Sequence, residues 1–249
     1  MSLPDPQDLE PITARAWPAA RQQCLGDWTL YATDGHSMRI NSCWVSGEPG
    51  LGLRAALDEV EAWYGGQGLS AIFKCAYDAG SDEPLAKALT DRGYVCGKET
   101  LVMVGPVAGA SVDVDVSVSS DLDDLFGAVF AATATDPADS TERLAALGRI
   151  ADPRFFARLE VNGQAAAIGA SAVEGDWAGI FGMRTAPNHR RQGYAARILA
   201  TLLAKARQAG ATKAYLQVEA ANVGAIPIYQ RAGFELAYRY YYWTRLAAH

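Results

Sequence analysis

The sequence predicts an α/β protein in which a mixed sheet is flanked by helices and the chain is divided into two similar halves. Strand-like and helix-like segments alternate through the second half. A glycine-containing turn at residues 187–195 joins a strand-like run to an amphipathic helix. The order helix, glycine, strand, helix, glycine also occurs in both halves, with Gly68 and Gly93 corresponding to Gly210 and Gly233.

Composition is that of a globular protein, with 50% hydrophobic and 20% charged residues among 249. This length is enough for two domains, each with its own core. A net charge of −6 argues against nucleic acid as the main partner, because neutralising phosphates requires clustered Lys and Arg. The sequence has no apolar run that could span a membrane, and its start has no signal-peptide pattern. We expect a soluble cytoplasmic protein without a membrane partner, and monomer and homodimer both remain open.

The four cysteines, Cys24, Cys43, Cys75 and Cys96, are widely spaced and have no histidine cluster nearby. Neither a metal site nor a disulfide framework is indicated by this spacing. We expect reduced, largely buried thiols that pack as small apolar side chains.

A new domain is predicted to begin after Gly105-Pro106, where residues 110–120 alternate between apolar and polar side chains as in a half-exposed strand. Asn162-Gly163 indicates a hairpin, and Pro227 must lie in the first turn of the last helix. Apolar residues from Ile198 to Ala206 recur on one helical face. The predicted helices are 122–132, 141–149, one from 195 to Gly210, and 222–231. The predicted strands are 155–161, 165–173, 177–185, 214–219 and two antiparallel segments within 234–246.

The first half repeats this order with a helix at 57–64, a strand at 70–75 and a helix at 85–91. It differs at the glycine turn, where residues 46–53 include Glu48, a carboxylate that would repel a phosphate. The first half is therefore expected to be a folded copy that binds no ligand.

Residues 183–196 are predicted to form a pyrophosphate seat. Gly193 allows a ligand to approach the backbone closely, and the helix that follows presents unpaired N–H groups and the positive end of its dipole. The amides of residues 192–195 would hold the pyrophosphate, and Arg190 or Arg191 would add positive charge. The alternative is an ordinary strand-to-helix connection with a solvated basic turn.

Arg190-x-x-Gly193-x-Ala195 resembles the [Gln/Arg]-x-x-Gly-x-[Gly/Ala] signature of the GCN5-related N-acetyltransferases. The resemblance extends to Asn222-x-x-Ala225-x-x-x-Tyr229-x-x-x-Gly233-Phe234, so that it covers roughly residues 112–246. It implies two tandem acyl-CoA N-acyltransferase-like domains, a degenerate one at 1–108 and a catalytic one at 109–249. It also implies acetyl-CoA as cosubstrate, direct attack by the primary amine of an acceptor in a ternary complex, no metal, and a V-shaped opening between two central parallel strands.

The same resemblance suggests a role for individual residues. Tyr229 is expected to protonate the departing thiolate, unless it only fills the core. Gly182 is expected to mark a bulge, unless it is a packing glycine, so that the main chain of Met183 and Thr185 bonds the pantetheine arm and Met183 N–H polarises the thioester. Asn222 would bond the arm, cap its helix, or do both. The expected cofactor-binding set is Met183, Arg184, Thr185, Arg190, Arg191, Gln192, Gly193, Tyr194, Ala195, Ala196, Asn222 and Tyr229.

A general base is less clearly marked, because no acidic residue lies within 178–185. Glu219 is the best-placed candidate, followed by Asp176 and Glu174, and its alternative is a solvated strand-end carboxylate. Gln217 stands where related enzymes that acetylate protein N-termini often carry Glu, which argues against protein acetylation. The predicted catalytic residues are Tyr229 and Glu219. Two other functions remain open: a non-catalytic acyl-CoA-binding module, and an acyltransferase for another acyl chain or acceptor atom.

Overall fold

The computed structural model describes residues 3–76 and 83–245. Its helices and strands lie in the predicted alternating order. The helices are α1 (Pro6–Arg15), α2 (Leu53–Gly65), α3 (Glu83–Asp91), α4 (Asp124–Ala132), α5 (Pro137–Gly148), α6 (Tyr194–Gln208), α7 (Ile226–Arg231) and the 3₁₀ turns η1 (Met38–Ile40) and η2 (Pro187–His189). The strands are β1 (Arg21–Leu25), β2 (Trp28–Ala32), β3 (Cys43–Val45), β4 (Ile72–Cys75), β5 (Tyr94–Pro106), β6 (Val116–Ser119), β7 (Arg154–Val161), β8 (Gln164–Glu174), β9 (Trp177–Thr185), β10 (Lys213–Glu219) and β11 (Glu235–Arg245).

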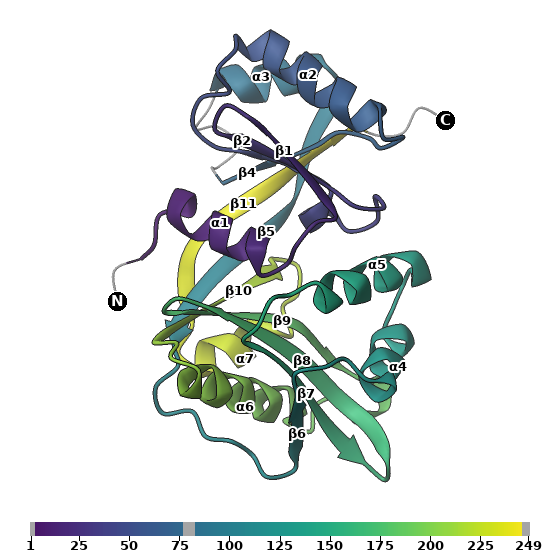
Figure 1. Cartoon of the computed structure of the whole chain (residues 1–249), viewed down its shortest axis with the longest axis vertical. Coiled ribbons are helices and arrows are strands. Elements are labelled where there is room, and N and C mark those ends of the chain that lie inside the picture. The colour runs from purple at the N-terminus through teal and green to yellow at the C-terminus, as the bar shows by residue number, and fades with distance from the viewer. Residues whose placement is uncertain (1–2, 77–82, 246–249) are drawn as a thin grey trace.

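Within the described residues, the strands form one continuous mixed sheet in the order β1-β2-β3-β4-β11-β5-β10-β9-β8-β7-β6. Two pairs are parallel, β3 with β4 and β9 with β10, and the other neighbours are antiparallel. Figure 1 shows helices α2 and α3 against the first-half end of this sheet and helices α6 and α7 against the second-half end. The predicted α/β class with a mixed sheet flanked by helices is confirmed.

Strands β5 and β11 join the two halves. The last strand of the first half, β5, pairs with β10 of the second half along Thr100 to Pro106. The last strand of the second half, β11, pairs with β4 of the first half. These two strands also pair with each other along most of their length (Figure 1). The division at 108/109 falls in the loop between β5 and β6 and stays a prediction, but separating the halves there would unpair both shared strands.

The repeat predicted between the halves appears as matching elements. In each half a helix (α2 or α6) is followed by a strand (β4 or β10) and a short helix (α3 or α7). That strand pairs in parallel with the strand before the helix, β3 in the first half and β9 in the second. Each half therefore has one parallel strand pair at its centre, β3 with β4 in the first half and β9 with β10 in the second.

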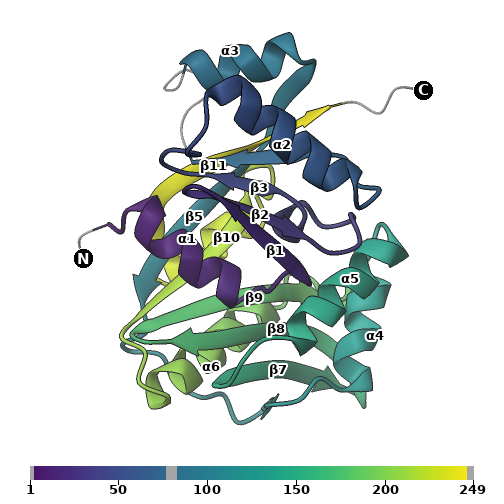
Figure 2. The same ribbon diagram turned by 45° about the horizontal axis from the view of Figure 1, so that its top comes forward.

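Buried apolar side chains form three clusters around this sheet. One lies under α2 and α3, a second under α6, and the third lies on the central sheet with α1 and α4. Figure 2 shows α1, α4 and α5 on the sheet face that is opposite α6. The predicted apolar face of α6 is confirmed, since Ile198, Leu199 and Leu202 are buried in the second cluster.

Some predicted elements differ from the structure. The strand expected at 110–120 is reduced to β6, because the side chain of Arg197 holds Asp113 and Asp115, each at 2.5 Å, and keeps that segment against α6. Two antiparallel segments were expected over 234–246, but β11 is a single strand with two irregularities, and residue 246 lies outside the described residues. Helix α5 begins earlier than expected, since Asp136 caps it through Ala138 N–H.

The last helix also starts later than predicted, at Ile226 and not at residue 222, with Pro227 in the first turn as expected. The prediction of largely buried cysteines holds for Cys43 and Cys75, but it is wrong for Cys24, which is exposed on the edge strand β1. No helix within residues 3–76 and 83–245 combines the length and apolar character needed for a membrane crossing.

Candidate functional site

The two parallel strands at the centre of the second half separate partway along their length. Strands β9 and β10 pair from Trp177 with Lys213 only as far as Ile180 with Leu216. Beyond that point β9 continues along β8, and β10 continues along β5. The predicted V-shaped opening between the central parallel strands is therefore present.

A β-bulge lies on β9 at the mouth of this opening. Gly182 and Met183 together stand opposite Gly169 of β8, so that β9 has one extra residue. Gly182 has a φ of +57°, which glycine adopts without strain. A Cβ at Gly169 would lie 2.4 Å from the Met183 sulfur, so the absent side chain makes room for Met183. The predicted bulge at Gly182 is confirmed, and the main chain there leaves the regular ladder.

The turn after β9 exposes a row of main-chain donors. Arg191 and Gly193 have left-handed φ angles of +61° and +78°, a conformation that costs a non-glycine residue about 1–2 kcal/mol. Within the described chain, the amides of residues 191–195 donate to no other protein group. The first bonded amides are those of Ala196 and Arg197, which donate to the Gly193 carbonyl at 3.1 and 3.3 Å. These unpaired donors lie at the positive end of α6, as a site for an anion requires.

A cavity of about 700 Å³ lies between this turn, the bulge and α7. It brings together every residue of the predicted cofactor set except Gln192. Gln192 lies on the exposed side of the turn, where its Oε1 accepts a bond from the Tyr194 hydroxyl at 2.9 Å. The lining residues are Thr133, Met183, Arg184, Thr185, His189, Arg190, Arg191, Gly193, Tyr194, Ala195, Ala196, Asn222, Gly224, Ala225, Ile228, Tyr229 and Arg231.

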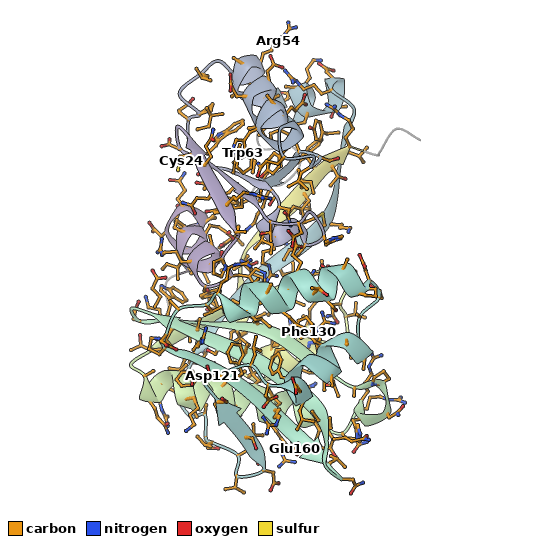
Figure 3. All side chains as sticks on the ribbon, turned by 45° about the vertical axis from the view of Figure 1, so that its right-hand side comes forward. Cys24, Arg54, Trp63, Asp121, Phe130 and Glu160 are labelled. Carbon is orange, nitrogen blue, oxygen red and sulfur yellow. The ribbon has the colours of Figure 1, made fainter. Side chains whose placement is uncertain are left out.

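One wall of the cavity comes from Thr133, the C-cap residue of α4, a residue that sequence reasoning did not connect with the site. The Arg184 guanidinium donates to the Thr133 hydroxyl at 3.0 Å and lies 3.9 Å from the centre of the Phe130 ring. Figure 3 labels Phe130 beside the sheet of this half. Burial is the main cause that lowers the pKa of Arg184. Nothing local in the sequence links Thr133 to Arg184, whereas Arg231 could have been found as a basic residue on the helix of Tyr229.

Tyr229 is placed on α7 with its ring largely buried and its side chain lining the cavity. It is 8% exposed, and burial raises the pKa of its hydroxyl to about 12. The hydroxyl has no hydrogen-bond partner in the part of the chain that the structure describes. Asn222 lines the same cavity, and its Oδ1 accepts a bond from Ala225 N–H at 3.3 Å. Asn222 therefore holds the turn just before α7 and lines the cavity, but the N-cap position of α7 itself is Ala225.

The acidic candidates for a base are not among the residues that line this cavity. Glu219 is the exposed last residue of β10, in register with Thr100 of β5. At the opposite end of β9, Glu174 is bound by Arg15 at 2.6 Å and Asp176 by Lys213 at 2.8 Å. No Asp or Glu is found among the described residues that line the cavity.

Comparison with known families and proteins identifies this architecture. A family model described as "Probable histone acetyltransferase Rv0428c C-terminal" matches residues 5–243. The chain is 24% identical over 248 residues to the "Uncharacterized N-acetyltransferase YobR" of Bacillus subtilis (strain 168), covering 96% of this chain and 98% of that protein. It is also 34% identical over 80 residues to the "[Ribosomal protein bS18]-alanine N-acetyltransferase" of Escherichia coli (strain K12), covering 32% of this chain and 54% of that protein.

Solved structures share the whole fold. A GCN5-related N-acetyltransferase from Kribbella flavida superposes with a TM-score of 0.70 at 18% identity, covering 98% of this chain and 96% of that one. A tandem GNAT protein from the clavulanic acid biosynthesis pathway superposes with a TM-score of 0.60 at 13% identity, covering 97% and 88%. Because the family model matches nearly the whole chain, this protein belongs to the family that the model describes, and it is a GCN5-related N-acetyltransferase.

Proposed function

We propose that this acetyltransferase moves the acetyl group of acetyl-CoA to a primary amine, by direct attack in a ternary complex in the second half. The observation that carries the proposal is the row of unpaired amides at residues 191–195, which borders the cavity lined by Tyr229. The cavity volume of about 700 Å³ lies within the usual range for small-molecule sites.

The pyrophosphate of CoA would bind at the turn. The amides of residues 191–195 would donate to its oxygens, and the α6 dipole would favour its negative charge. Arg190, Arg191 and Arg231 line the same cavity and would add positive charge. These three side chains would give the pyrophosphate site the positive charge that a diphosphate needs.

The pantetheine arm would extend along β9 where β10 has separated from it. Main-chain groups of Met183 and Thr185 would bond the arm as a short additional strand. At the bulge, Met183 N–H would donate to the thioester carbonyl, and this bond strengthens as negative charge develops on that oxygen. Asn222, which lines the same cavity, would face the same arm.

In the transfer step the amine nitrogen bonds to the thioester carbon, and the carbon–sulfur bond breaks with its electron pair leaving on sulfur. Tyr229 would donate a hydrogen bond to that sulfur, and the N–H proton that the attacking nitrogen loses on becoming an amide balances the proton that the thiolate takes up. Thiols have a pKa of about 8.5, well below the pKa of about 12 of Tyr229. Complete proton transfer is therefore uphill, and the larger contribution of the hydroxyl is hydrogen bonding to the developing thiolate.

The acceptor ammonium must also lose a proton before it attacks. Since Glu219 is exposed and outside the lining of the cavity, we propose that it would accept this proton only through intervening water. The ammonium would also be deprotonated if water alone carried the proton to solvent. Measuring kcat against pH for the parent and Glu219→Gln separates these two routes. If Glu219 accepts the proton, the variant loses the part of the pH profile that depends on this carboxylate. If water alone carries the proton, the two profiles have the same shape.

The test is a thiol-release assay with acetyl-CoA and a panel of amines, run beside calorimetric titration of CoA. We expect CoA binding and amine-dependent thiol release. Binding without turnover on any amine would overturn the enzymatic proposal and favour a non-catalytic acyl-CoA-binding module. Rates with propionyl-CoA and succinyl-CoA, measured in parallel, determine the acyl preference.

A further inference from the structure

The side chain of Arg184 lies on the sheet face opposite the proposed pyrophosphate site. Successive residues of a strand point to opposite faces. On β9 the side chain of Met183 packs against the buried cluster under α6, whereas the Arg184 guanidinium lies 3.9 Å from the centre of the Phe130 ring on α4. Figure 2 shows α4 and α6 on opposite faces of this sheet. The sheet therefore separates the guanidinium from the start of α6, where the pyrophosphate of CoA would bind.

One edge of this guanidinium is free. Its Nη1 donates to the hydroxyl and to the carbonyl of Thr133, at 3.0 and 3.3 Å. Among the described residues, Nε and Nη2 have no hydrogen-bond partner. These two nitrogens form one edge of the planar fork, and their parallel N–H groups match the two oxygens of a carboxylate.

The positive charge of Arg184 is also not balanced by a carboxylate. Within the described chain it forms no ion pair, and the charged side chains that act on it, Arg143 and Asp139 of α5, bind each other at 2.8 Å. Since those two charges neutralise each other, one positive charge is left over. Burial is the main cause that lowers the pKa of Arg184, and an anion bound to the guanidinium would offset this cost.

This charge lies close to where the thioester would be attacked. The Cα atoms of Met183 and Arg184 are about 3.8 Å apart, as across any trans peptide, so one Arg side chain separates the guanidinium from the main chain that would hold the thioester. The cavity is lined by Thr133 at the end of α4 and by Tyr194 of α6, so it reaches both faces of the sheet. With CoA bound on the α6 face, the amine would approach from the α4 face.

We propose that the acceptor is a small amine that carries one carboxylate, and that Arg184 binds this carboxylate while the amine attacks the thioester. This inference rests on the proposed function and names the class of its acceptor. Nε–H and Nη2–H would donate to the two carboxylate oxygens, and one carboxylate matches the one charge left over. The arm of CoA would fill part of the cavity of about 700 Å³, so the remaining room suits a short amino acid.

The test measures kcat/KM for glycine, β-alanine, 4-aminobutyrate and 6-aminohexanoate, each beside its own amide, which has nearly the same shape without the charge. In the parent we expect at least one acid to exceed its amide by about tenfold or more, as for a hydrogen bond to a charged group. Arg184→Gln should remove most of this preference. Equal kcat/KM for every acid and its amide in the parent would overturn the proposal.

A purely structural role of Arg184 gives a different result. Its bond to the Thr133 carbonyl holds the end of α4, so loss of that bond alone would change the rates with acids and amides alike. Arg149→Gln is the matched control, because Arg149 also donates to a main-chain carbonyl, that of Pro18 at 2.9 Å, and is not among the described residues that line the cavity. This control should keep the acid-to-amide ratio of the parent. The parent's ratio in Arg184→Gln would contradict the proposal.

Two further comparisons test the kind of anion. Arg184→Lys keeps the charge but lacks the planar fork, so its acid-to-amide ratio should fall between those of the parent and Arg184→Gln. 2-Aminoethyl phosphate should be a poorer acceptor than β-alanine, because its second negative charge has no counterpart at this end of the cavity. A higher kcat/KM for the phosphate would overturn the assignment to a carboxylate.

CoA affinity distinguishes the acceptor from CoA as the partner of Arg184. Arg191 lies in the turn before α6, and Arg191→Gln should weaken CoA binding in calorimetric titration far more than Arg184→Gln does. An equal loss in the two variants would assign the Arg184 side chain to a phosphate of CoA and would rule out its role toward the acceptor.

Binding of the acetylated product tests the site independently of turnover. In NMR spectra of the full chain, the Arg184 Nε–H signal is identified by its loss in Arg184→Gln. N-acetyl-β-alanine, titrated with CoA present, should shift this signal, and N-acetyl-β-alaninamide should not. A shift without acetylation of any amine means that the proposed function fails while the carboxylate site is retained. A signal that responds to neither compound would overturn the site itself.

Discussion

The hydroxyl of Tyr240 donates to Oε1 of Gln217 at 3.0 Å, which ties β11 to β10, one of the two strands that border the V-shaped opening. The other end of that amide, Gln217 Nε2, is buried without a partner. The amide is thus held from one side only. The core therefore positions this amide, which retains an unused donor beside the opening between β9 and β10.

Tyr240→Phe should destabilise the protein by about 1–2 kcal/mol, because it leaves a buried amide with neither end bonded. Gln217→Leu removes the amide but leaves the buried Tyr240 hydroxyl without its acceptor, so a loss of similar size is expected. Urea unfolding of both single variants and of the double variant measures the coupling. If the two changes prove additive, the hydrogen bond contributes nothing and the pair does not act as a unit.

Gly193→Glu should abolish CoA binding, whereas Gly50→Glu should leave it intact. The two glycines are matched, with φ angles of +78° and +74° and no atom closer than 3.9 Å to an added Cβ. Both variants therefore carry a similar backbone penalty of about 1–2 kcal/mol, and only the first adds a carboxylate to the proposed pyrophosphate seat. Calorimetric titration with CoA decides this, and loss of binding in both variants would contradict a ligand-free first half.

Tyr229→Phe should lower kcat by about tenfold or more while the Kd for acetyl-CoA stays within about twofold, because the hydroxyl acts only as sulfur leaves. Its pKa of about 12 adds a second expectation. The hydroxyl stays protonated through neutral pH, so it should produce no inflection in kcat below about pH 10. Steady-state kinetics across pH check both points, and equal kcat values for parent and variant would remove Tyr229 from the mechanism.

The features that the sequence predicted best are those that depend on local sequence patterns. The Gly182 bulge, the turn at Gly193 and the repeated helix-strand-helix order depend on glycine positions and apolar spacing, and the structure contains each of them. The residues of the predicted cofactor set are nearly all gathered at one cavity for the same reason. That they bind CoA stays a prediction.

What the sequence did not predict depends on contacts between distant segments. The sharing of β5 and β11 between the halves results from pairing registers, such as Tyr241 with Cys75, that no local spacing specifies. The wall that Thr133 contributes to the cavity depends on how α4 packs over β9. The late start of the strand expected at 110–120 comes from Arg197 on α6, far along the chain, which binds Asp113.

That ion pair predicts a stability change at low pH. Hydrogen bonding to Arg197 lowers the pKa of Asp113 to about 2, below the value of about 3.9 for an unfolded aspartate. A carboxyl whose pKa is lower in the folded state stabilises the protein fully above its unfolded pKa and loses that effect as pH falls through its folded pKa. Asp113→Asn should therefore lower the melting temperature at pH 6 and have little effect at pH 2. Asp121→Asn, a control on a far more exposed carboxylate, should change neither, and an equal loss for Asp113→Asn at both pH values would contradict the assignment.

The strongest single loss of stability is expected from breaking the buried pair of Glu10 and Lys74. Lys74→Met leaves a carboxylate without its counter-ion between α1 and β4, which typically costs about 3–5 kcal/mol. Glu10→Gln combined with Lys74→Met removes both charges and should recover much of this loss, because the uncompensated buried charge is gone. Urea unfolding of the single and double variants measures the recovery. Should the double variant be less stable than Lys74→Met, the pair would not be the source of the loss, and the bonds of Glu10 to Tyr238 and Thr13 would account for it.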